Sequence, residues 1–224
     1  MLLTGGRDAS CRVWDMRTRT QVHILTGHED AVSSILANGA DPQVVTGSMD
    51  STVRTWDLAA GRVRSVLTHH KKSVRALAGH SSEFAFCSAS VDAVKRWALP
   101  DCTFVHGYGG AGRAGGAPSG SIVNALALNA DGVLVGGGDD GSLQLWDYGT
   151  GHAFQASASV PQPGSLDAEA GIFAAAFDAT GSRLITAEAD KTIKIWREDP
   201  DATPASHPID MAAWEEQCRA FRRY

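Results

Sequence analysis

Four side chains in one short stretch have the types needed for acid–base chemistry. His28, Thr46 and Asp50 provide an imidazole, a hydroxyl and a carboxylate, the groups of a hydrolase triad, and Trp56 adds an indole N–H. A GxSxG nucleophile elbow does not occur in the sequence. The set also recurs along the chain, as a catalytic constellation would not. We therefore interpret it as structural, because a buried polar group left unpaired costs about 1 to 3 kcal/mol and neighbouring strands let these groups pair.

The recurrence has a regular spacing. Successive tryptophans lie 41 to 50 residues apart, and an aspartate precedes each by six residues, or by five in the third copy. Four places before the aspartate stands a threonine or a serine, except for a glycine in the fourth copy. The copies contain Thr4, Asp8 and Trp14; His28, Thr46, Asp50 and Trp56; His70, Ser88, Asp92 and Trp97; Gly136, Asp140 and Trp146; and Thr186, Asp190 and Trp196. This period is that of a propeller blade.

Each copy has the pattern of a four-stranded antiparallel sheet. In the second copy, β-rich runs at 31–36, 43–46, 52–58 and 62–67 are separated by turn residues. In the third copy, Pro100 is expected to shorten the strand that follows it. The first copy begins on its second strand and the fifth ends on its third. We therefore expect incomplete sheets at both ends.

This pattern, over residues 1 to about 197, resembles the WD40 repeat family. Three runs outside the general consensus resemble one branch of it, the pleiotropic regulator family of the spliceosome's nineteen complex: THHKKSVRAL (68–77), QPGSLDAEAGI (162–172) and EADKTIKIWREDPDATPASHPI (188–209). The resemblance implies an all-β fold, a seven-bladed WD40 β-propeller preceded by a long N-terminal region. We therefore expect residues 1–198 to form part of such a ring, an open arc of about four to five blades.

The last residues, 199–224, are expected to form a separate tail. Within 211–224, Trp214, Cys218 and Phe221 recur at helical spacing. The pattern predicts a short amphipathic helix, which at this length is marginal in water and would order only by docking. The resembled family has a proline- and lysine-rich extended tail at this point, so the segment departs from it.

Composition and charge exclude several function classes. Hydrophobic residues make up 43% of 224 residues, enough for a core. The net charge of −5, from 20 Lys and Arg against 25 Asp and Glu, gives no general basic field for naked nucleic acid. No long apolar run and no charged leader occur, so we expect neither a membrane span nor a secretory signal. A nuclear location fits the resemblance.

Cofactor and metal motifs are absent from the sequence. The four cysteines lie far apart without a CxxC pair, and no histidines have HxH or HExxH spacing. Gly107, Gly109 and Gly112 match GxGxxG, but a proline and then a strand follow where a dinucleotide site needs a helix. We interpret this match as coincidence in a glycine-rich loop and expect no cofactor.

The candidate partner-binding residues lie in loops. In a propeller, the turn after the second strand and the residues before the first strand emerge on the same face, because strand direction alternates within a blade. These positions hold Arg7, Met49 and Val91 in the turns, and Asp30, Lys71 and Lys72 before first strands. Methionine and arginine are enriched at interfaces. Plain solvated turns are the alternative, and the two lysines could also contact an acidic protein surface or RNA within an assembly.

A long connection at 156–171 is the other candidate. Prolines and glycines preclude a regular element there, and Asp167 and Glu169 make it acidic. Long loops in compact domains are usually functional or disordered. Because this loop contains one of the family-like runs, we favour a partner contact over disorder.

Two function classes remain. The resemblance implies a non-catalytic scaffold that presents its loops to splicing proteins of the nineteen complex during pre-mRNA splicing, with RNA contacted locally or indirectly. The alternative is a substrate receptor of a cullin-RING ubiquitin ligase, since Trp14-Asp15-Met16-Arg17 resembles the WDxR ending of such receptors, in which Arg17 would contact the ligase adaptor. The same arginine is also common in exposed loops.

Overall fold

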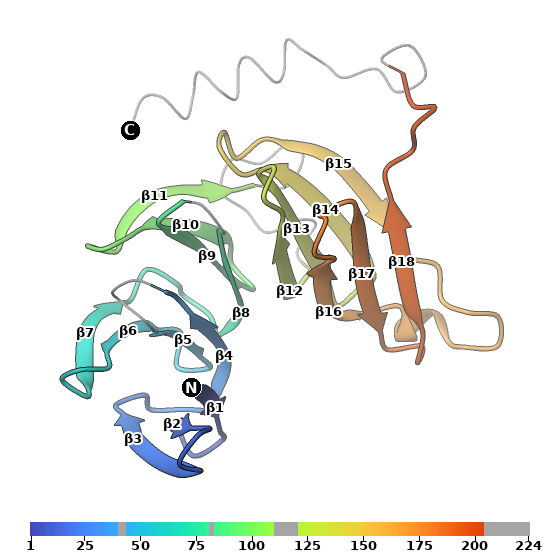
Figure 1. Cartoon of the computed structure of the whole chain (residues 1–224). Helices are drawn as coiled ribbons and strands as arrows, with labels where there is room; N and C mark the ends of the chain where they lie inside the picture. The colour runs from blue at the N-terminus through green and yellow to red at the C-terminus, as the bar shows by residue number, and fades with distance from the viewer. Residues whose placement is uncertain (40–43, 81–82, 110–120, 204–224) are drawn as a thin grey trace.

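The computed structural model describes residues 1–39, 44–80, 83–109 and 121–203, in which eighteen strands form five antiparallel sheets (Figure 1). Each sheet pairs its strands in sequence order and forms one blade. Blade 1 contains β1 (Leu2–Gly5), β2 (Ser10–Asp15) and β3 (Thr20–Thr26). Blade 2 contains β4 (Val32–Ala37), β5 (Val44–Ser48), β6 (Val53–Asp57) and β7 (Arg62–Leu67). Blade 3 contains β8 (Val74–Gly79), β9 (Ala85–Ser90), β10 (Val94–Ala98) and β11 (Thr103–Tyr108).

The remaining two blades complete the described fold. Blade 4 contains β12 (Val123–Leu128), β13 (Val133–Gly138), β14 (Ser142–Asp147) and β15 (Ala153–Ala158). Blade 5 contains β16 (Ile172–Phe177), β17 (Arg183–Glu188) and β18 (Ile193–Arg197), and the short 3₁₀ helix η2 (Asp167–Glu169) precedes it. The helix expected within 211–224 lies outside the described residues, as do Gly112 and Cys218. Within the described part, no helix is long and apolar enough to cross a membrane.

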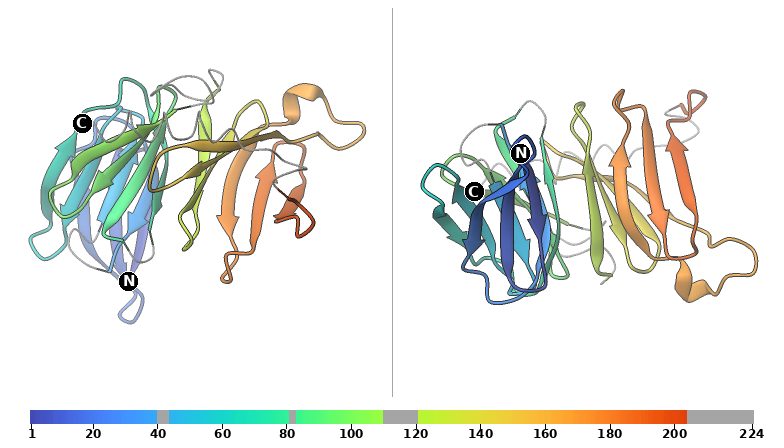
Figure 2. Two further views of the ribbon diagram at one scale, coloured as in Figure 1. Left: turned by 90° about the horizontal axis from the view of Figure 1, so that it is seen from above. Right: turned by 60° about the horizontal axis from the view of Figure 1, so that its bottom comes forward.

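The five blades stand side by side in an arc that does not close (Figures 1 and 2). Along the inner edge, the first strands of blades 2 to 5 are neighbours: β4 lies beside β8, β8 beside β12 and β12 beside β16. In blade 1, β1 holds the place of a second strand and lies beside β4. Among the described strands, none of blade 1 pairs with one of blade 5. The predicted all-β fold is therefore confirmed, as an open arc with three-stranded sheets at its ends.

The shorter spacing in the third copy has a backbone cause. In the other four copies, the residue after the turn aspartate takes the left-handed conformation, with φ of 58° at Ala9, 68° at Ser51, 80° at Gly141 and 67° at Lys191. The turn between β9 and β10 closes instead with the Ser90 amide donating to the Ala93 carbonyl at 3.1 Å, one residue earlier than in blade 2. The missing residue is thus the left-handed one.

Pro100 does not shorten the strand after it, so that prediction was wrong. β11 contains six residues, as many as β7. Pro100 lies in the connection between β10 and β11, before the ladder begins at Thr103. Its lack of an N–H therefore removes no ladder hydrogen bond.

The apolar core lies between the blades. Four clusters of buried side chains each join two neighbouring blades. Between blades 1 and 2, for example, the cluster consists of Cys11, Val13, Leu25, Val44, Trp56 and Leu58. The second strands β5 and β9 are buried at every residue, because both of their faces meet a neighbouring blade.

A small residue in the second strand lets the next blade approach closely. Gly47 and Gly137 hold equivalent places in β5 and β13. A Cβ at Gly47 would lie 2.8 Å from Cγ1 of Val74, and one at Gly137 would lie 2.5 Å from Cγ2 of Ile172. The branched side chain at the start of each following first strand therefore occupies the space that a side chain on the glycine would need.

Gly137→Val is expected to destabilise the packing of blade 5 on blade 4. Its side chain would overlap Ile172, and overpacking of a well-filled core typically costs about 1 to 3 kcal/mol. The free energy of unfolding from urea titration measures the loss. Gly39→Val is the matched control, because nothing lies within 4 Å of a Cβ there. Equal unfolding midpoints for the two variants would contradict this account of blade packing.

Candidate functional site

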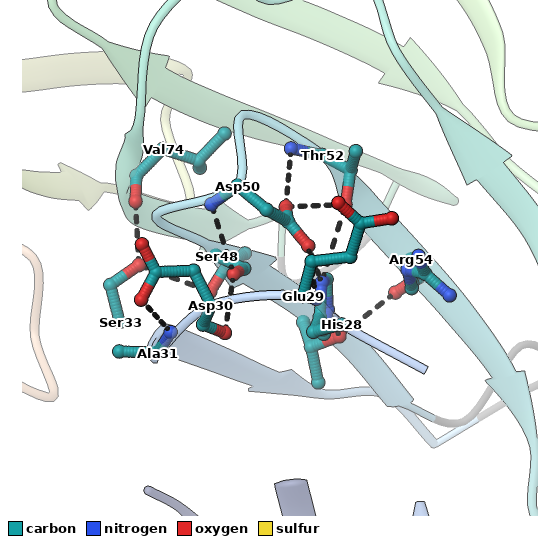
Figure 3. Close-up of polar contacts among 12 residues, drawn as sticks. His28, Glu29, Asp30, Ala31, Ser33, Ser48, Asp50, Thr52, Arg54 and Val74 are labelled. Atoms are coloured by element: carbon teal, nitrogen blue, oxygen red, sulfur yellow. Dashed lines mark hydrogen bonds and ion pairs between the residues drawn. The ribbon is translucent and has the colours of Figure 1, made fainter. Parts of the chain in front are cut away.

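One connected set of hydrogen bonds joins His28, Thr46, Asp50 and Trp56 inside blade 2. His28 Nδ1 lies 2.8 Å from Asp50 Oδ2, near the top of the sheet (Figure 3), and His28 Nε2 lies 2.7 Å from Thr46 Oγ1. Trp56 Nε1 donates to the same threonine oxygen at 2.8 Å. A carboxylate only accepts, so Nδ1 donates to Asp50 and Nε2 accepts the proton of Thr46. The set thereby links the segment before β4 to β5 and β6.

Asp50 also fixes the loop above the set. It accepts the Glu29 amide at 3.1 Å, and the amide and hydroxyl of Thr52 at 2.8 and 2.6 Å (Figure 3). Burial alone would raise the pKa of Asp50, but these bonds and the one from His28 lower it to about 2. The carboxylate is therefore charged at neutral pH and holds both the turn and the segment before β4.

The corresponding set in blade 3 has the bonding pattern of a Ser-His-Asp triad. Ser88 Oγ lies 2.7 Å from His70 Nε2, and Asp92 Oδ1 lies 3.2 Å from His70 Nδ1. Ser88 is fully buried, however, and its oxygen accepts the N–H of Trp97 at 2.8 Å. A serine enclosed in this way cannot reach a substrate. The arrangement therefore cross-links strands, as the sequence interpretation expects.

Burial keeps both histidines neutral. Desolvation lowers the pKa of His28, against the effect of Asp50, and lowers the pKa of His70 to about 4, with the nearby Lys95 adding to the shift. Neutral imidazole can donate at one nitrogen and accept at the other, which the two sets require.

Blade 1 contains only part of the set. Trp14 Nε1 donates to Thr4 Oγ1 at 3.0 Å. Asp8 instead accepts the Ser10 hydroxyl at 2.8 Å and pairs with Arg12 at 2.5 Å. Thr4 and Trp14 thus lie on the paired strands β1 and β2, and Asp8 lies in the turn between them without a bond to the threonine.

Blade 4 satisfies its tryptophan in another way. Gly136 supplies no hydroxyl, and Trp146 Nε1 donates to the Gly109 carbonyl, at the end of blade 3, at 2.8 Å. The indole lies against Gly136, where a Cβ would come within 2.7 Å of its Cζ3. Asp140 accepts the Ser142 amide at 2.9 Å and makes no bond to Trp146. The glycine is therefore needed for the position of the ring.

Blade 5 replaces the histidine with an ionic network. Trp196 donates to Thr186 at 2.9 Å, as in blade 2, but the Thr186 hydroxyl donates to Glu188 at 3.1 Å. Lys194 Nζ lies 2.5 Å from Glu188 and 3.7 Å from Asp190, and both of these carboxylates are fully buried. Thr186 and Asp190 are thus linked through Glu188 and Lys194.

The sequence interpretation missed Glu188 and Lys194. One signal for the lysine is present: the position two places before the tryptophan is also basic in the first three copies, with Arg12, Arg54 and Lys95. No equivalent signal marks Glu188, because the corresponding positions hold serine or glycine.

The turns after second strands and the segments before first strands meet on one face, which we call the upper face. The Met49 amide donates to the Ala31 carbonyl at 3.0 Å, and the Ser48 hydroxyl donates to the Asp30 carbonyl at 2.9 Å (Figure 3 shows Asp30 and Ser48). In blade 3, Ser90 donates to the Lys72 carbonyl at the same distance. The backbone of this face is therefore fixed from below, while its charged side chains extend outward.

The predicted partner-binding residues on this face differ in exposure. Arg7, Asp30, Lys71 and Lys72 are exposed, whereas Met49 and Val91 are half-buried. Arg7 lies beside blade 2, since the carbonyl of the preceding Gly6 accepts the Val32 amide at 3.1 Å. Positive charge from blades 1 and 3 thus flanks Asp30.

The connection before β16 reaches the same face. The backbone amide of Gln162 donates to the Asp190 carboxylate at 2.9 Å, and Lys194 Nζ donates to the Val160 carbonyl at 2.6 Å. Val160 and Leu166 are 78% and 70% exposed, and Glu169 is half-buried. Asp167 opens η2. Exposed apolar side chains on an anchored loop are typical of interaction sites, so a partner contact by this loop stays a prediction.

Arg17 lies apart from these residues. It belongs to the turn between β2 and β3, at the opposite end of blade 1 from Arg7, and its side chain is 87% exposed. Across the described ranges, no group of three or more His, Cys, Asp or Glu side chains is arranged to hold a metal ion.

Asp50→Ala is expected to destabilise blade 2 by about 1 to 3 kcal/mol, because His28 and the Glu29 amide lose their acceptor. Asp140→Ala should have a smaller effect, since Asp140 is exposed and bonds to no histidine. The shift in thermal unfolding midpoint measures both. Equal shifts for the two variants would contradict the conclusion that Asp50 stabilises its blade through His28 and the Glu29 amide.

The buried histidines should make stability fall in acid. The unfolded chain binds a proton at His70 below a pH of about 6.5, whereas the folded chain does so only near pH 4. Stability contributed by neutral His70 is therefore complete above pH 6.5 and declines as the pH falls toward 4, by about 2 kcal/mol at pH 5. In urea unfolding between pH 7 and 5, His70→Asn should show a flatter decline than the wild type. Parallel curves of unfolding free energy against pH for the variant and the wild type would exclude His70 as a source of the loss of stability in acid.

The family model of the WD40 repeat (WD domain, G-beta repeat) matches residues 19–57, 115–147 and 162–197. Each matched segment ends one residue after a repeat tryptophan, those of blades 2, 4 and 5. Blade 3 lies outside these segments, although its four strands and its His70 set follow the same plan.

Curated relatives are similar to part of the chain. The pleiotropic regulator PRL2 of Arabidopsis thaliana is 51% identical over 126 residues, which is 56% of this chain and 25% of the relative. Human pleiotropic regulator 1 is 47% identical over 141 residues, 63% of this chain and 25% of the relative. The pre-mRNA-splicing factor PRP46 of Yarrowia lipolytica is 47% identical over 114 residues, 51% of this chain and 24% of the relative.

The alignments thus cover about a quarter of the length of these relatives. The blades, the tryptophan–hydroxyl bonds and the family match agree. The chain is a WD40 repeat protein, homologous over part of its length to the pleiotropic regulators and to the splicing factor PRP46.

Proposed function

We propose that the chain is a non-catalytic scaffold of the spliceosome that acts in pre-mRNA splicing in the nucleus. Its upper face would bind splicing proteins of the nineteen complex, with RNA contacted locally or indirectly. The observation that carries the proposal is the similarity to splicing factors of the PRP46 and pleiotropic regulator type.

The upper face supports binding in two ways. Its backbone is held by a hydrogen bond from the Glu29 amide to Asp50 and by bonds from the hydroxyls of Ser48 and Ser90, so it is ordered before a partner arrives. Its exposed side chains include both charge signs, which favours recognition of a partner with complementary charges. The hydroxyls of Thr46 and Ser88 lie enclosed below this face and are not accessible to a substrate.

Arg7→Glu together with Lys72→Glu should reduce recovery of splicing partners and leave the melting temperature nearly unchanged, because both side chains are exposed and lie outside the buried sets. A tagged chain is incubated in splicing-competent nuclear extract and purified at high salt, and the recovered splicing proteins and U5 and U6 RNA are quantified. Arg19→Glu with Arg62→Glu is the matched control, with equal charge change at the opposite end of the blades.

Other outcomes of this experiment assign the interface elsewhere. Wild-type recovery by the Arg7 and Lys72 variant would exclude those two positions, and loss on Val160→Asp with Leu166→Asp would then place the contact on the loop before β16. Recovery of a cullin adaptor without RNA, abolished by Arg17→Glu alone, would favour the ubiquitin-ligase receptor. The 87% exposure of Arg17 leaves it accessible for that role.

A further inference from the structure

The upper face changes the sign of its charge from one blade to the next. Blade 2 presents Glu29 and Asp30 just before β4 (Figure 3). Blade 3 presents Lys71 and Lys72 at the equivalent places before β8. All four residues are exposed. We call the two residues of blade 2 the acidic pair and the two residues of blade 3 the basic pair.

The acidic pair and the basic pair lie side by side. The Ser33 hydroxyl of β4 donates to the Val74 carbonyl of β8 at 2.5 Å (Figure 3), which joins the two first strands just below both pairs. Even so, no ion pair among the described residues includes a side chain of either pair. Lys95, in β10 of blade 3, lies 3.5 Å from Asp92 and is neutralised by it. The charges of the two pairs are therefore not neutralised by the described part of the chain.

The flanking blades continue the alternation. In blade 1, Asp8 pairs with Arg12, so the exposed Arg7 gives this end of the face a positive charge. In blade 4, Asp139 and Asp140 are both exposed in the turn after β13. From blade 1 to blade 4, the sign of the exposed charge is therefore positive, negative, positive and negative.

We propose that the upper face binds an extended protein segment whose acidic and basic residues alternate with the spacing of the blades. The segment would place acidic residues over Arg7 and the basic pair, and basic residues over the acidic pair and the two aspartates of blade 4. Neighbouring sheets lie about 10 Å apart and an extended residue spans about 3.3 Å, so the charge of the segment changes sign about every three residues. This proposal rests on the proposed scaffold function and specifies the chemistry of the partner.

A protein segment fits this face better than RNA does. RNA carries charge of one sign along its whole backbone, so it would be attracted by the basic pair and repelled by the acidic pair beside it. A segment with both signs is complementary at each blade, and like charges brought together in a wrong register are unfavourable. The alternation therefore favours a protein segment that binds in one register.

Two labelled peptides of identical composition test the proposal. In the alternating peptide, glutamate pairs and lysine pairs follow each other with single glycines between them. In the block peptide, all glutamates precede all lysines. Fluorescence anisotropy at low ionic strength measures the binding of each peptide to the 224-residue chain. The wild type should bind the alternating peptide about tenfold more tightly, because several modest surface ion pairs are lost when the signs fall out of register. Added salt should reduce this difference.

An exchange of charges between the acidic pair and the basic pair should reverse the preference. The variant has four substitutions that leave the net charge unchanged: Glu29→Lys, Asp30→Lys, Lys71→Glu and Lys72→Glu. From blade 1 to blade 4, the order of signs becomes positive, positive, negative and negative, which is complementary to the block peptide. This variant should therefore bind the block peptide more tightly than the alternating peptide.

Arg62→Glu with Asp101→Lys is the matched control, because it exchanges charges between exposed residues at the opposite end of the blades and should keep the wild-type preference. Equal affinity of the wild type for the two peptides, or an unchanged preference in the fourfold variant, would overturn the proposal. Tighter binding of single-stranded RNA than of the alternating peptide would also overturn it. These measurements use no nuclear extract, so their failure is distinguishable from a failure to recover splicing proteins, which would count against the scaffold function itself.

Discussion

A propeller blade cannot bury its own faces, and the fold of this chain depends on that constraint. A single sheet has two broad sides and no interior, so its apolar residues are covered only by the blades next to it. All four buried clusters accordingly join two blades. The close fit of Val74 and Ile172 against glycines shows how near the sheets approach. Where a neighbour is missing, at Leu2 and Ile193, the same positions are exposed.

The second requirement is a partner for each indole N–H, and the blades meet it in two ways. Blades 1, 2, 3 and 5 use a hydroxyl of the second strand. In blades 2 and 3 a neutral histidine continues the connection to the turn aspartate, whereas in blade 5 Glu188 and Lys194 do so with charges. Blade 4 uses a backbone carbonyl of blade 3. Different residues thus serve one need, because an unpaired buried donor is costly.

The repeat was predictable because tryptophan and aspartate mark the same two points of each blade. That spacing indicated the number of blades, the incomplete sheets at both ends and the second-strand hydroxyls. Residues that act across strands were harder to predict. Glu188 and Lys194 form their ion pair only after β17 pairs with β18, and no local sequence pattern predicts that pair. Pro100 was expected to shorten the next strand because the connection before β11 cannot be recognised in the linear pattern. The partner-binding residues remain predictions, since they depend on a molecule outside the chain.

The bond from Trp146 to the Gly109 carbonyl couples the folding of blade 4 to that of blade 3. In a blade whose indole is satisfied by its own threonine, the polar interior is complete as soon as that sheet forms. Blade 4 completes its interior only when the end of blade 3 is already in place. Local opening at this seam therefore exposes a polar group as well as apolar surface, which raises the free energy of separating these two blades. Blades 3 and 4 should therefore open as one cooperative unit.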